Sequence, residues 1–326
     1  MKNICTAITL GLLTAGCTSR AAPPQPDTAP GKPATPGHAT HTLTSGGHER
    51  TYGVYVPTSY TGKTPLPLVV VLHGGGGSSH STLRDSNWQQ KAEAETFLLV
   101  TPNGLARDPT QPAKFRGNPQ TWNDGSGRFT HGDKAELIDD VAFLDAMLDE
   151  IIGKLAVDEK RVYVTGFSNG AAMTFRFGER SKRRIAAIAP VAGACWSERP
   201  RLAHPIPLCY ITGDKDLLNP MNGGTITLPG GTAALNATPK PSVSECVARW
   251  SRALGEDTAL EPRETLSHGV RVTTNRKSVT LVTIPGLGHY WPGGARNLPE
   301  AIAGPYVNVF DATGFIWDFF ARHPVR

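Results

Sequence analysis

The chain has 326 residues, of which 39% are apolar and 7% aromatic, so it can bury a sizeable core as one large α/β domain or two small ones. Its formal net charge of +5 is small for this length, and the sequence contains no nucleic-acid-binding motif, so we expect no nucleic-acid partner. Glycine (35 residues) and proline (27 residues) are both frequent, which favours a loop-rich fold with an extended tether.

Residues 1–17 have the pattern of an export signal. Lys2 supplies a positive charge, residues 4–13 are mostly apolar but too few to span a bilayer, and small residues precede Cys17. The ending resembles the lipobox of bacterial lipoproteins, in which the cysteine is acylated, although Thr14 stands where leucine is usual. We therefore expect a bacterial cell-envelope protein anchored to a membrane by lipid on Cys17. The alternative is cleavage at another small residue and release as a soluble secreted protein.

Residues 18–41 are rich in Pro, Ala, Thr and Gly and contain almost nothing to bury, which predicts a disordered spacer. His38, His41 and His48 lie in or just after this polar stretch. Scattered histidines of this kind do not indicate a metal site, so we predict none. A single folded domain is expected to cover residues 42–326.

The first strands of this domain lead into a glycine run. Residues 51–56 alternate as a strand does, and residues 67–72 are continuously apolar, which is typical of a central strand buried on both faces. His73 and the glycines 74–77 follow directly, and such a run lets backbone amides approach a ligand closely. The spacing lacks the G-K-[ST] of a phosphate loop. A merely flexible connection is the alternative.

A helix over 86–94, a strand over 97–100 and a loop over 108–128 come next. Within that loop Trp122 is either a wall of a binding pocket or an anchor for the loop itself. The following helix, over 137–155, carries its apolar residues on one face.

Two acidic residues near the start of the 137–155 helix, Asp139 and Asp140, could be taken for catalytic carboxylates. We interpret them instead as salt-bridge or capping groups.

The stretch 161–177 (RVYVTGFSNGAAMTFRF) organises the rest of the chain. It contains a short β-branched strand, the pattern G-x-S-x-G, and a run of good helix formers. A turn this sharp leaves no room for side chains at Gly166 and Gly170, and it lifts the hydroxyl of Ser168 to the N-terminus of a helix. This pattern predicts a nucleophilic serine. A serine that only caps the helix is the alternative.

The remaining elements alternate, which indicates a mostly parallel, doubly wound sheet without internal repeats. Strands are predicted over 185–191, 206–212, 271–274 and 279–284, and helices over 243–254 and 313–320. The long Gly/Pro-rich stretch 217–242 is interpreted as a loop that covers the site.

A serine becomes a nucleophile when a histidine removes its proton, and a carboxylate must hold that histidine in place. On a doubly wound sheet the chain order is serine, acid after a later strand, then histidine near the end. Ser168, Asp216 and His289 follow this order. Asp216 lies just past the end of a predicted strand, and Asp214 is its competitor.

Several motifs together resemble one family. They are strand-HGGGG, Trp122-Asn123, Asp139-Asp140-Val141, GFSNGAAM, Gly-x-x-Asp ending at Asp216, Asn219-Pro220 with Gly223-Gly224, and GHYWPGG. Over about residues 50–320 the chain resembles the poly(3-hydroxybutyrate) depolymerase/feruloyl esterase-like secreted α/β-hydrolases, and among them the lipoproteins called LpqC-like.

This resemblance implies an α/β-hydrolase fold and an esterase with an acyl-serine intermediate. It implies that the amides of Gly75, with Gly76 as its neighbour, and Asn169 form the oxyanion hole. It also implies that Trp291 lines the acyl site. Thr212 departs from the family, in which histidine often precedes the glycine, and this should affect orientation more than mechanism.

After Cys5 and Cys17, three cysteines remain, and three cannot all pair. Cys209 lies in a predicted buried strand and is expected to be inert. Cys195 and Cys246 are the candidate pair for a disulfide.

The hypothesis that unites these features is a serine carboxylesterase that needs no cofactor. Its substrates would be feruloyl or acetyl esters of polysaccharides or short hydroxyalkanoate esters. A serine peptidase on the same fold and a non-catalytic lipoprotein that binds esters or glycans are the alternatives. Oligomeric state is not indicated by the sequence.

Overall fold

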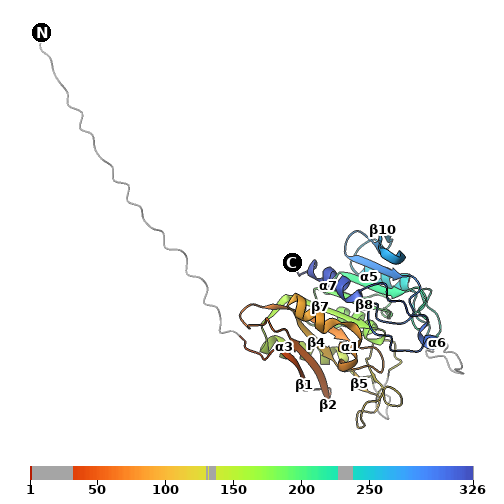
Figure 1. Cartoon of the computed structure of the whole chain (residues 1–326), viewed down its shortest axis with the longest axis horizontal. Helices are drawn as coiled ribbons and strands as arrows, with labels where there is room; N and C mark the ends of the chain where they lie inside the picture. The colour runs from red at the N-terminus through yellow and green to blue at the C-terminus, as the bar shows by residue number, and fades with distance from the viewer. Residues whose placement is uncertain (2–31, 130, 132–136, 227–237, 326) are drawn as a thin grey trace. The chain divides into compact units, whose positions relative to one another are not determined.

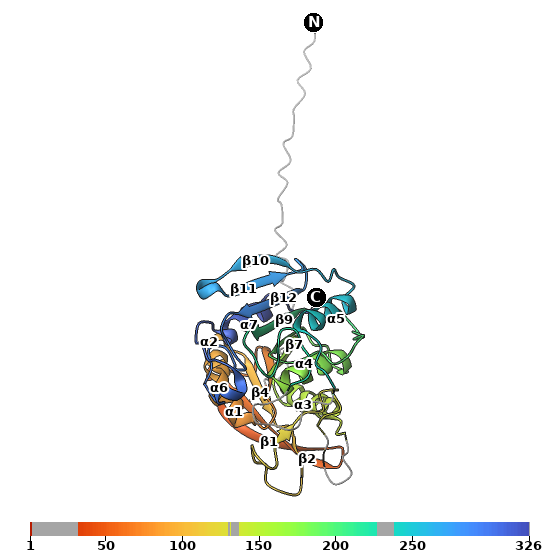
Figure 2. The same cartoon turned by 90° about the vertical axis from the view of Figure 1, so that its right-hand side faces the viewer.

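The computed structural model describes residues 1, 32–129, 131, 137–226 and 238–325. Across these ranges ten strands form one sheet with helices on both of its faces (Figures 1 and 2). The predicted export signal with Cys5 and Cys17 lies outside the described residues. The order of the strands is β1 (Gly37–Ser45), β2 (His48–Val56), β4 (Leu98–Pro102), β3 (Leu66–Leu72), β7 (Val157–Phe167), β8 (Ala187–Val191), β9 (Leu208–Gly213), β12 (Val279–Ile284), β11 (Arg271–Thr274) and β10 (Glu261–Thr265).

The middle of the sheet is parallel and its two margins are antiparallel. Neighbouring strands from β4 through β3, β7, β8 and β9 to β12 run parallel, whereas β1 pairs antiparallel with β2, β2 with β4, β10 with β11, and β11 with β12. The mostly parallel, doubly wound sheet predicted from the sequence is therefore confirmed. A separate short pair consists of β5 (Leu105–Ala106) and β6 (Gln120–Thr121).

The predicted start of the folded domain at residue 42 is wrong, because β1 already begins at Gly37. This strand pairs with β2 along its whole length, from Gly37 opposite Val56 to Ser45 opposite His48. Its side chains are exposed or only half-buried, so it has no apolar pattern of its own to signal a strand. Residues 37–41 therefore belong to the sheet, and not to the predicted spacer.

The helices of the described chain are α1 (Ser79–Ser86), α2 (Trp88–Glu95), α3 (Asp140–Lys154), α4 (Asn169–Arg180), α5 (Val243–Ala253), α6 (Glu300–Ala303) and α7 (Ala312–Ala321), with a 3₁₀ turn at Ser267–Gly269. The helix predicted over 86–94 corresponds to α2, whereas α1 has no counterpart among the predicted elements. The chain turns sharply at Asn87, whose φ of 57° is left-handed, and this residue separates α1 from α2. None of the helices in the described part is long and apolar enough to cross a membrane.

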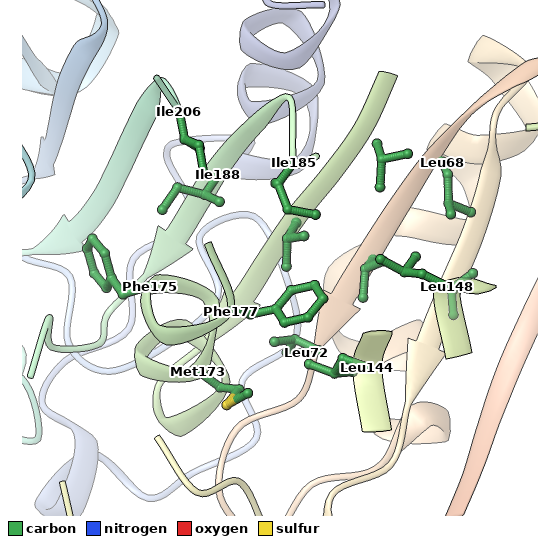
Figure 3. Packing of buried hydrophobic residues seen from close by; sticks show 14 of the residues in the cluster. Leu68, Leu72, Leu144, Leu148, Met173, Phe175, Phe177, Ile185, Ile188 and Ile206 are labelled. Atoms are coloured by element: carbon green, nitrogen blue, oxygen red, sulfur yellow. The ribbon is translucent and has the colours of Figure 1, made fainter. Parts of the chain in front are cut away.

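Two buried layers of apolar side chains hold the helices to the sheet. Alternate residues of β3 face opposite layers: Leu68, Val70 and Leu72 pack with α3, α4 and α5, whereas Val69 and Val71 pack with α2 and α7. Figure 3 shows the first layer, in which α4 side chains such as Phe177 lie among strand residues. The continuous apolar run over β3 thus reflects burial on both faces.

Candidate active site

Ser168 lies on a strained turn between β7 and α4. Its φ of 56° and ψ of −117° are unusual for a residue other than glycine, and such strain persists only where the surroundings fix it. A Cβ at Gly166 would lie 2.5 Å from the carbonyl oxygen of Gly170, and one at Gly170 would collide with the carbonyl oxygens of Leu72 and His73. The steric reason given for both glycines is thus present in the structure.

The structure brings Ser168, His289 and Asp216 into one hydrogen-bonded row. The Nε2 atom of His289 lies 2.8 Å from the Oγ of Ser168, and its Nδ1 atom lies 2.8 Å from Oδ2 and 3.0 Å from Oδ1 of Asp216. His289 is 2% exposed and Asp216 is 4% exposed. Because the carboxylate can only accept, Nδ1 carries the proton and Nε2 is free to accept from the serine hydroxyl.

The acid of this row is held by the turn that follows it. The Oδ1 atom of Asp216 accepts hydrogen bonds from the amides of Leu218, at 2.8 Å, and Asn219, at 2.7 Å. These two amides hold the carboxylate in the orientation in which it reaches His289. Asp214, the competitor in the sequence, instead accepts from the amide of Gly286 at 2.8 Å. Geometry therefore selects Asp216 as the partner of His289.

The loop that carries His289 is fixed by its own backbone. The amides of Gly288 and His289 donate to the carbonyl oxygens of Pro305 and Ala303, each at 2.6 Å. The Phe167 ring lies against the imidazole, with 4.7 Å between ring centroids. These contacts leave the buried imidazole little freedom to turn.

The glycine loop and the start of α4 present two amides beside Ser168. Gly76 donates its amide to the carbonyl oxygen of Gln120 at 2.7 Å, so that amide is occupied. Within the described chain the amides of Gly75 and Asn169 have no acceptor. A Cβ at Gly75 would lie 3.8 Å from the Cβ of Asn169, so the two residues adjoin. Of the two neighbouring glycines, the free amide favours Gly75.

His73 fixes the geometry of the glycine loop. Its Nε2 accepts from the amide of Gly104 at 2.8 Å, and its Nδ1 donates to the carbonyl oxygen of Gly74 at 2.7 Å. Burial lowers the pKa of His73 to about 4, because the apolar surroundings disfavour the charged ring. The neutral form is also the form that this pair of hydrogen bonds requires.

Trp122 does not form a wall of the site. It is fully buried, its indole N–H donates to the carbonyl oxygen of His73 at 2.9 Å, and its amide donates to the side-chain oxygen of Asn169 at 2.8 Å. The Asn169 amide group donates in turn to the carboxylate of Asp124 at 2.9 Å. Of the two interpretations of Trp122, the burial and the hydrogen bonds support the loop anchor.

Trp291 is also a buried residue, with 5% of its surface exposed. Its indole N–H donates to the hydroxyl of Thr313 in α7 at 3.0 Å, and its ring packs edge-on against Trp88, with centroids 6.4 Å apart. The expectation that it lines the acyl site is not supported, because its ring is used to attach the His289 loop to the core.

The structure shows the state of the three cysteines and of Thr212. Cys195, Cys209 and Cys246 are buried free thiols, so the candidate disulfide is not formed. The Sγ atom of Cys246 instead accepts from the amide of Cys195 at 3.2 Å. The Thr212 hydroxyl is buried and has no hydrogen-bond partner among the described residues. Those residues also contain no group of three or more His, Cys, Asp or Glu side chains placed to hold a metal.

A cleft of about 670 Å³ adjoins the Asp216 turn. It is lined by residues of 214–217, 220–222 and 300–305, among them the exposed Leu217. Ser168 and His289 do not line it, so it borders the acid and not the nucleophile.

A serine on a strand–turn–helix elbow of a mostly parallel sheet, hydrogen-bonded to a histidine and an aspartate in that chain order, defines an α/β-hydrolase. Solved structures support this fold. An acetyl xylan esterase from Aspergillus awamori superposes with a TM-score of 0.52 at 17% identity, over 77% of this chain and 94% of that one. A structure of a protein called pOPH gives the same TM-score at 17% identity, over 92% and 90%.

Sequence comparison identifies the family. The model of the phospholipase/carboxylesterase family matches residues 59–235, and the chain belongs to that family. The candidate esterase NocK of Nocardia uniformis subsp. tsuyamanensis is 32% identical over 73% of this chain and 69% of its own length. Feruloyl esterase C of Emericella nidulans is 26% identical over 56% of this chain, and feruloyl esterase B of Piromyces equi is 28% identical over 72%. The chain spans 62% and 42% of the lengths of these last two relatives.

The predicted resemblance to feruloyl esterase-like α/β-hydrolases is thereby confirmed, and membership of the phospholipase/carboxylesterase family makes the chain a carboxylic ester hydrolase. What the sequence missed is the support around the site. The sequence gives no signal for Asp124, which holds Asn169, and it indicates Asn219 only as part of a motif without a role. Lys240 contacts the Asp216 turn and has no signal in the sequence.

Proposed function

We propose that this protein hydrolyses carboxylic esters through an acyl intermediate on Ser168. The observation that carries the proposal is the 2.8 Å contact between the Ser168 hydroxyl and a histidine whose other nitrogen is held by Asp216. As the serine oxygen attacks the ester carbonyl carbon, His289 Nε2 takes its proton. Asp216 stabilises the imidazolium that forms and keeps its ring oriented.

The carbonyl oxygen becomes negatively charged as the tetrahedral intermediate forms. The amides of Gly75 and Asn169, with the positive end of α4 behind Asn169, would receive this oxyanion. His289 then returns the proton to the leaving alcohol, which breaks the ester C–O bond and leaves an acyl-serine. Water, activated by the same histidine, attacks the acyl group and releases the acid.

We further propose feruloyl or acetyl esters of polysaccharide as the substrate class. The support is that two sequence relatives are feruloyl esterases and that an acetyl xylan esterase has the same fold. Short hydroxyalkanoate esters are the competing class within the same chemistry. We also propose that the protein is exported and anchored through Cys17, which rests on the pattern of residues 1–17.

Replacement of the nucleophile tests the proposal. Purified Ser168→Ala protein should lose hydrolysis of p-nitrophenyl acetate by about four to six orders of magnitude, because removing the nucleophile of a triad leaves only binding and the oxyanion hole. Initial rates and labelling by a fluorophosphonate probe are the measurements. Ser59→Ala, at an exposed serine after β2, is the matched control and should keep wild-type rate and labelling.

A Ser168→Ala protein that turned over esters at the wild-type rate would defeat the mechanism. The substrate class is decided separately, by comparing kcat/KM for methyl ferulate, acetylated xylo-oligosaccharides and hydroxybutyrate oligomers. A preference for the oligomers over both of the other esters would reject the proposed class and leave the mechanism intact.

A further inference from the structure

Lys240 reaches the turn that holds the triad acid. Its Nζ atom donates to the carbonyl oxygen of Leu218 at 2.7 Å and to the side-chain oxygen of Asn219 at 3.3 Å. These are the two residues whose amides donate to Asp216. The lysine backbone is itself fixed, because its amide and carbonyl pair with Gly224 at 3.0 and 2.9 Å. One ammonium group therefore binds both residues that cap the Asp216 carboxylate.

Asn219, which Lys240 contacts, also connects the Asp216 turn to the turn that carries Ser168. Asn219 donates from its side-chain amide to the hydroxyl of Tyr210 at 3.0 Å, and this hydroxyl donates to the carbonyl oxygen of Gly193 at 2.6 Å. Gly193 in turn lies so close to Ser168 that a Cβ there would collide with the serine carbonyl oxygen. A continuous row of hydrogen bonds and close packing thus runs from Lys240 to the backbone of the nucleophile.

The charge on Lys240 is poorly solvated. Burial is the main cause that lowers its pKa to about 8, and the nearby Arg128 guanidinium acts in the same direction. The Asp216 and Asp124 carboxylates oppose this shift, and the Cys246 thiol is uncharged at this pH because its own pKa is about 11. The ammonium group therefore loses its proton within the pH range in which an esterase can be assayed.

We propose that Lys240 is a positioning residue, whose ammonium group fixes the Asp216 turn and through it the alignment of His289 with Ser168. This inference rests on the catalytic roles proposed above. Lys240 has its contacts with the turn and not with Ser168 or His289, so its effect should fall on kcat and leave KM nearly unchanged. Deprotonation weakens its two hydrogen bonds, so kcat should fall as the pH rises through about 8.

The test compares Lys240→Met and Lys240→Arg with the wild-type protein in kcat and KM for p-nitrophenyl acetate from pH 6 to 10. Lys240→Met should lower kcat at pH 7 on the order of tenfold, as for one lost hydrogen bond to a charged group, and should lack the alkaline decline. Lys240→Arg keeps a charge at all these pH values. It should recover most of kcat at pH 7 and retain it above pH 9.

Lys63→Met, at an exposed lysine, is the matched control and should keep both kcat and the alkaline decline. Thermal unfolding of each variant establishes that it is folded. A wild-type alkaline decline that persists unchanged in Lys240→Arg would overturn the inference, even if Lys240→Met fails to fold. So would Lys240→Met with wild-type kcat and pH profile. Both of these comparisons are made on an esterase activity that Ser168→Ala abolishes. If Ser168→Ala kept the activity, the proposed function would fail, and that failure would be distinguishable from a failure of the inference about Lys240.

Discussion

His73 illustrates how much a single residue outside the triad contributes to the site. It lies between a buried strand and the glycine loop, and its ring holds the Gly74 carbonyl and the Gly104 amide at once. The sequence indicates that the glycine run matters, but not that the preceding histidine must stay neutral. That requirement comes from burial and from the direction of the two hydrogen bonds, which only the folded chain defines.

The neutral state of His73 predicts an acid-sensitive fold. Its pKa is about 4 in the folded chain and about 6.5 when unfolded, so the unfolded chain binds more protons between these values. Its contribution to stability is therefore full above pH 6.5 and is lost as the pH falls towards 4. We expect the free energy of unfolding to drop by about 3 kcal/mol over this range from this group, at about 1.4 kcal/mol per unit.

Guanidinium chloride unfolding at pH 7, 5.5 and 4 measures this loss. In His73→Gln the protein should be less stable at pH 7 and should lose less stability on acidification. His268→Gln, at an exposed histidine, serves as the comparison and should keep the wild-type slope. An unchanged pH slope in His73→Gln would contradict the assignment.

At the scale of elements, one buried ion pair joins β2, the strand next to the edge of the sheet, to the helix layer. Arg50 in β2 donates to Asp140 in α3 at 2.6 Å, and the two residues are 2% and 1% exposed. The other oxygen of Asp140 accepts from the amide of Asn123 at 2.7 Å, and the guanidinium lies 3.9 Å from the ring centroid of Phe143. Asp139 caps α3 through the Ala142 amide, so both acids have the structural roles predicted for them.

Breaking this pair should be costly. Asp140→Ala leaves the Arg50 charge buried without its partner, and we expect a loss of about 3–5 kcal/mol in the free energy of unfolding. The double variant Arg50→Met/Asp140→Leu removes both charges and should be more stable than the single variant. Urea unfolding of the wild-type protein, the single variant and the double variant gives the three free energies of unfolding to compare. A double variant no more stable than Asp140→Ala would show that packing, and not the unpaired charge, decides the loss.

Elements buried on two faces could be predicted from the sequence, whereas those defined by a partner could not. β3, β7 and β9 carry their own apolar runs, and the order of Ser168, Asp216 and His289 follows from the strands that precede them. By contrast, β10 is exposed along its whole length and is a strand only because β11 pairs with it. The helix break at Asn87 and the contact of Lys240 with a distant turn likewise depend on tertiary contacts.

At the scale of the whole molecule, the proposed lipid anchor would set the location of the protein and not its fold. The support lies in residues 1–17 alone, ahead of the sheet that begins at Gly37. When the full chain is produced in a bacterium with a fatty-acid label, the label should enter the protein and the protein should fractionate with membranes. Cys17→Ala should lose both properties while keeping esterase activity in the released protein.

Cys5→Ala is the matched control, because its cysteine precedes the proposed cleavage position, and it should still be labelled. Membrane association and labelling that survive in Cys17→Ala would rule the anchor out.

The three buried cysteines of the folded domain have a consequence for their reactivity. Burial raises the pKa of Cys246 to about 11 and that of Cys209 further, so these thiols stay protonated and sheltered. Because these cysteines are free thiols, a reducing agent has no disulfide to break between them. Cys246 is buried on α5, so we expect a thiol reagent to reach it only when α5 separates from its neighbours. The rate at which Cys246 reacts would then measure the rate at which α5 opens.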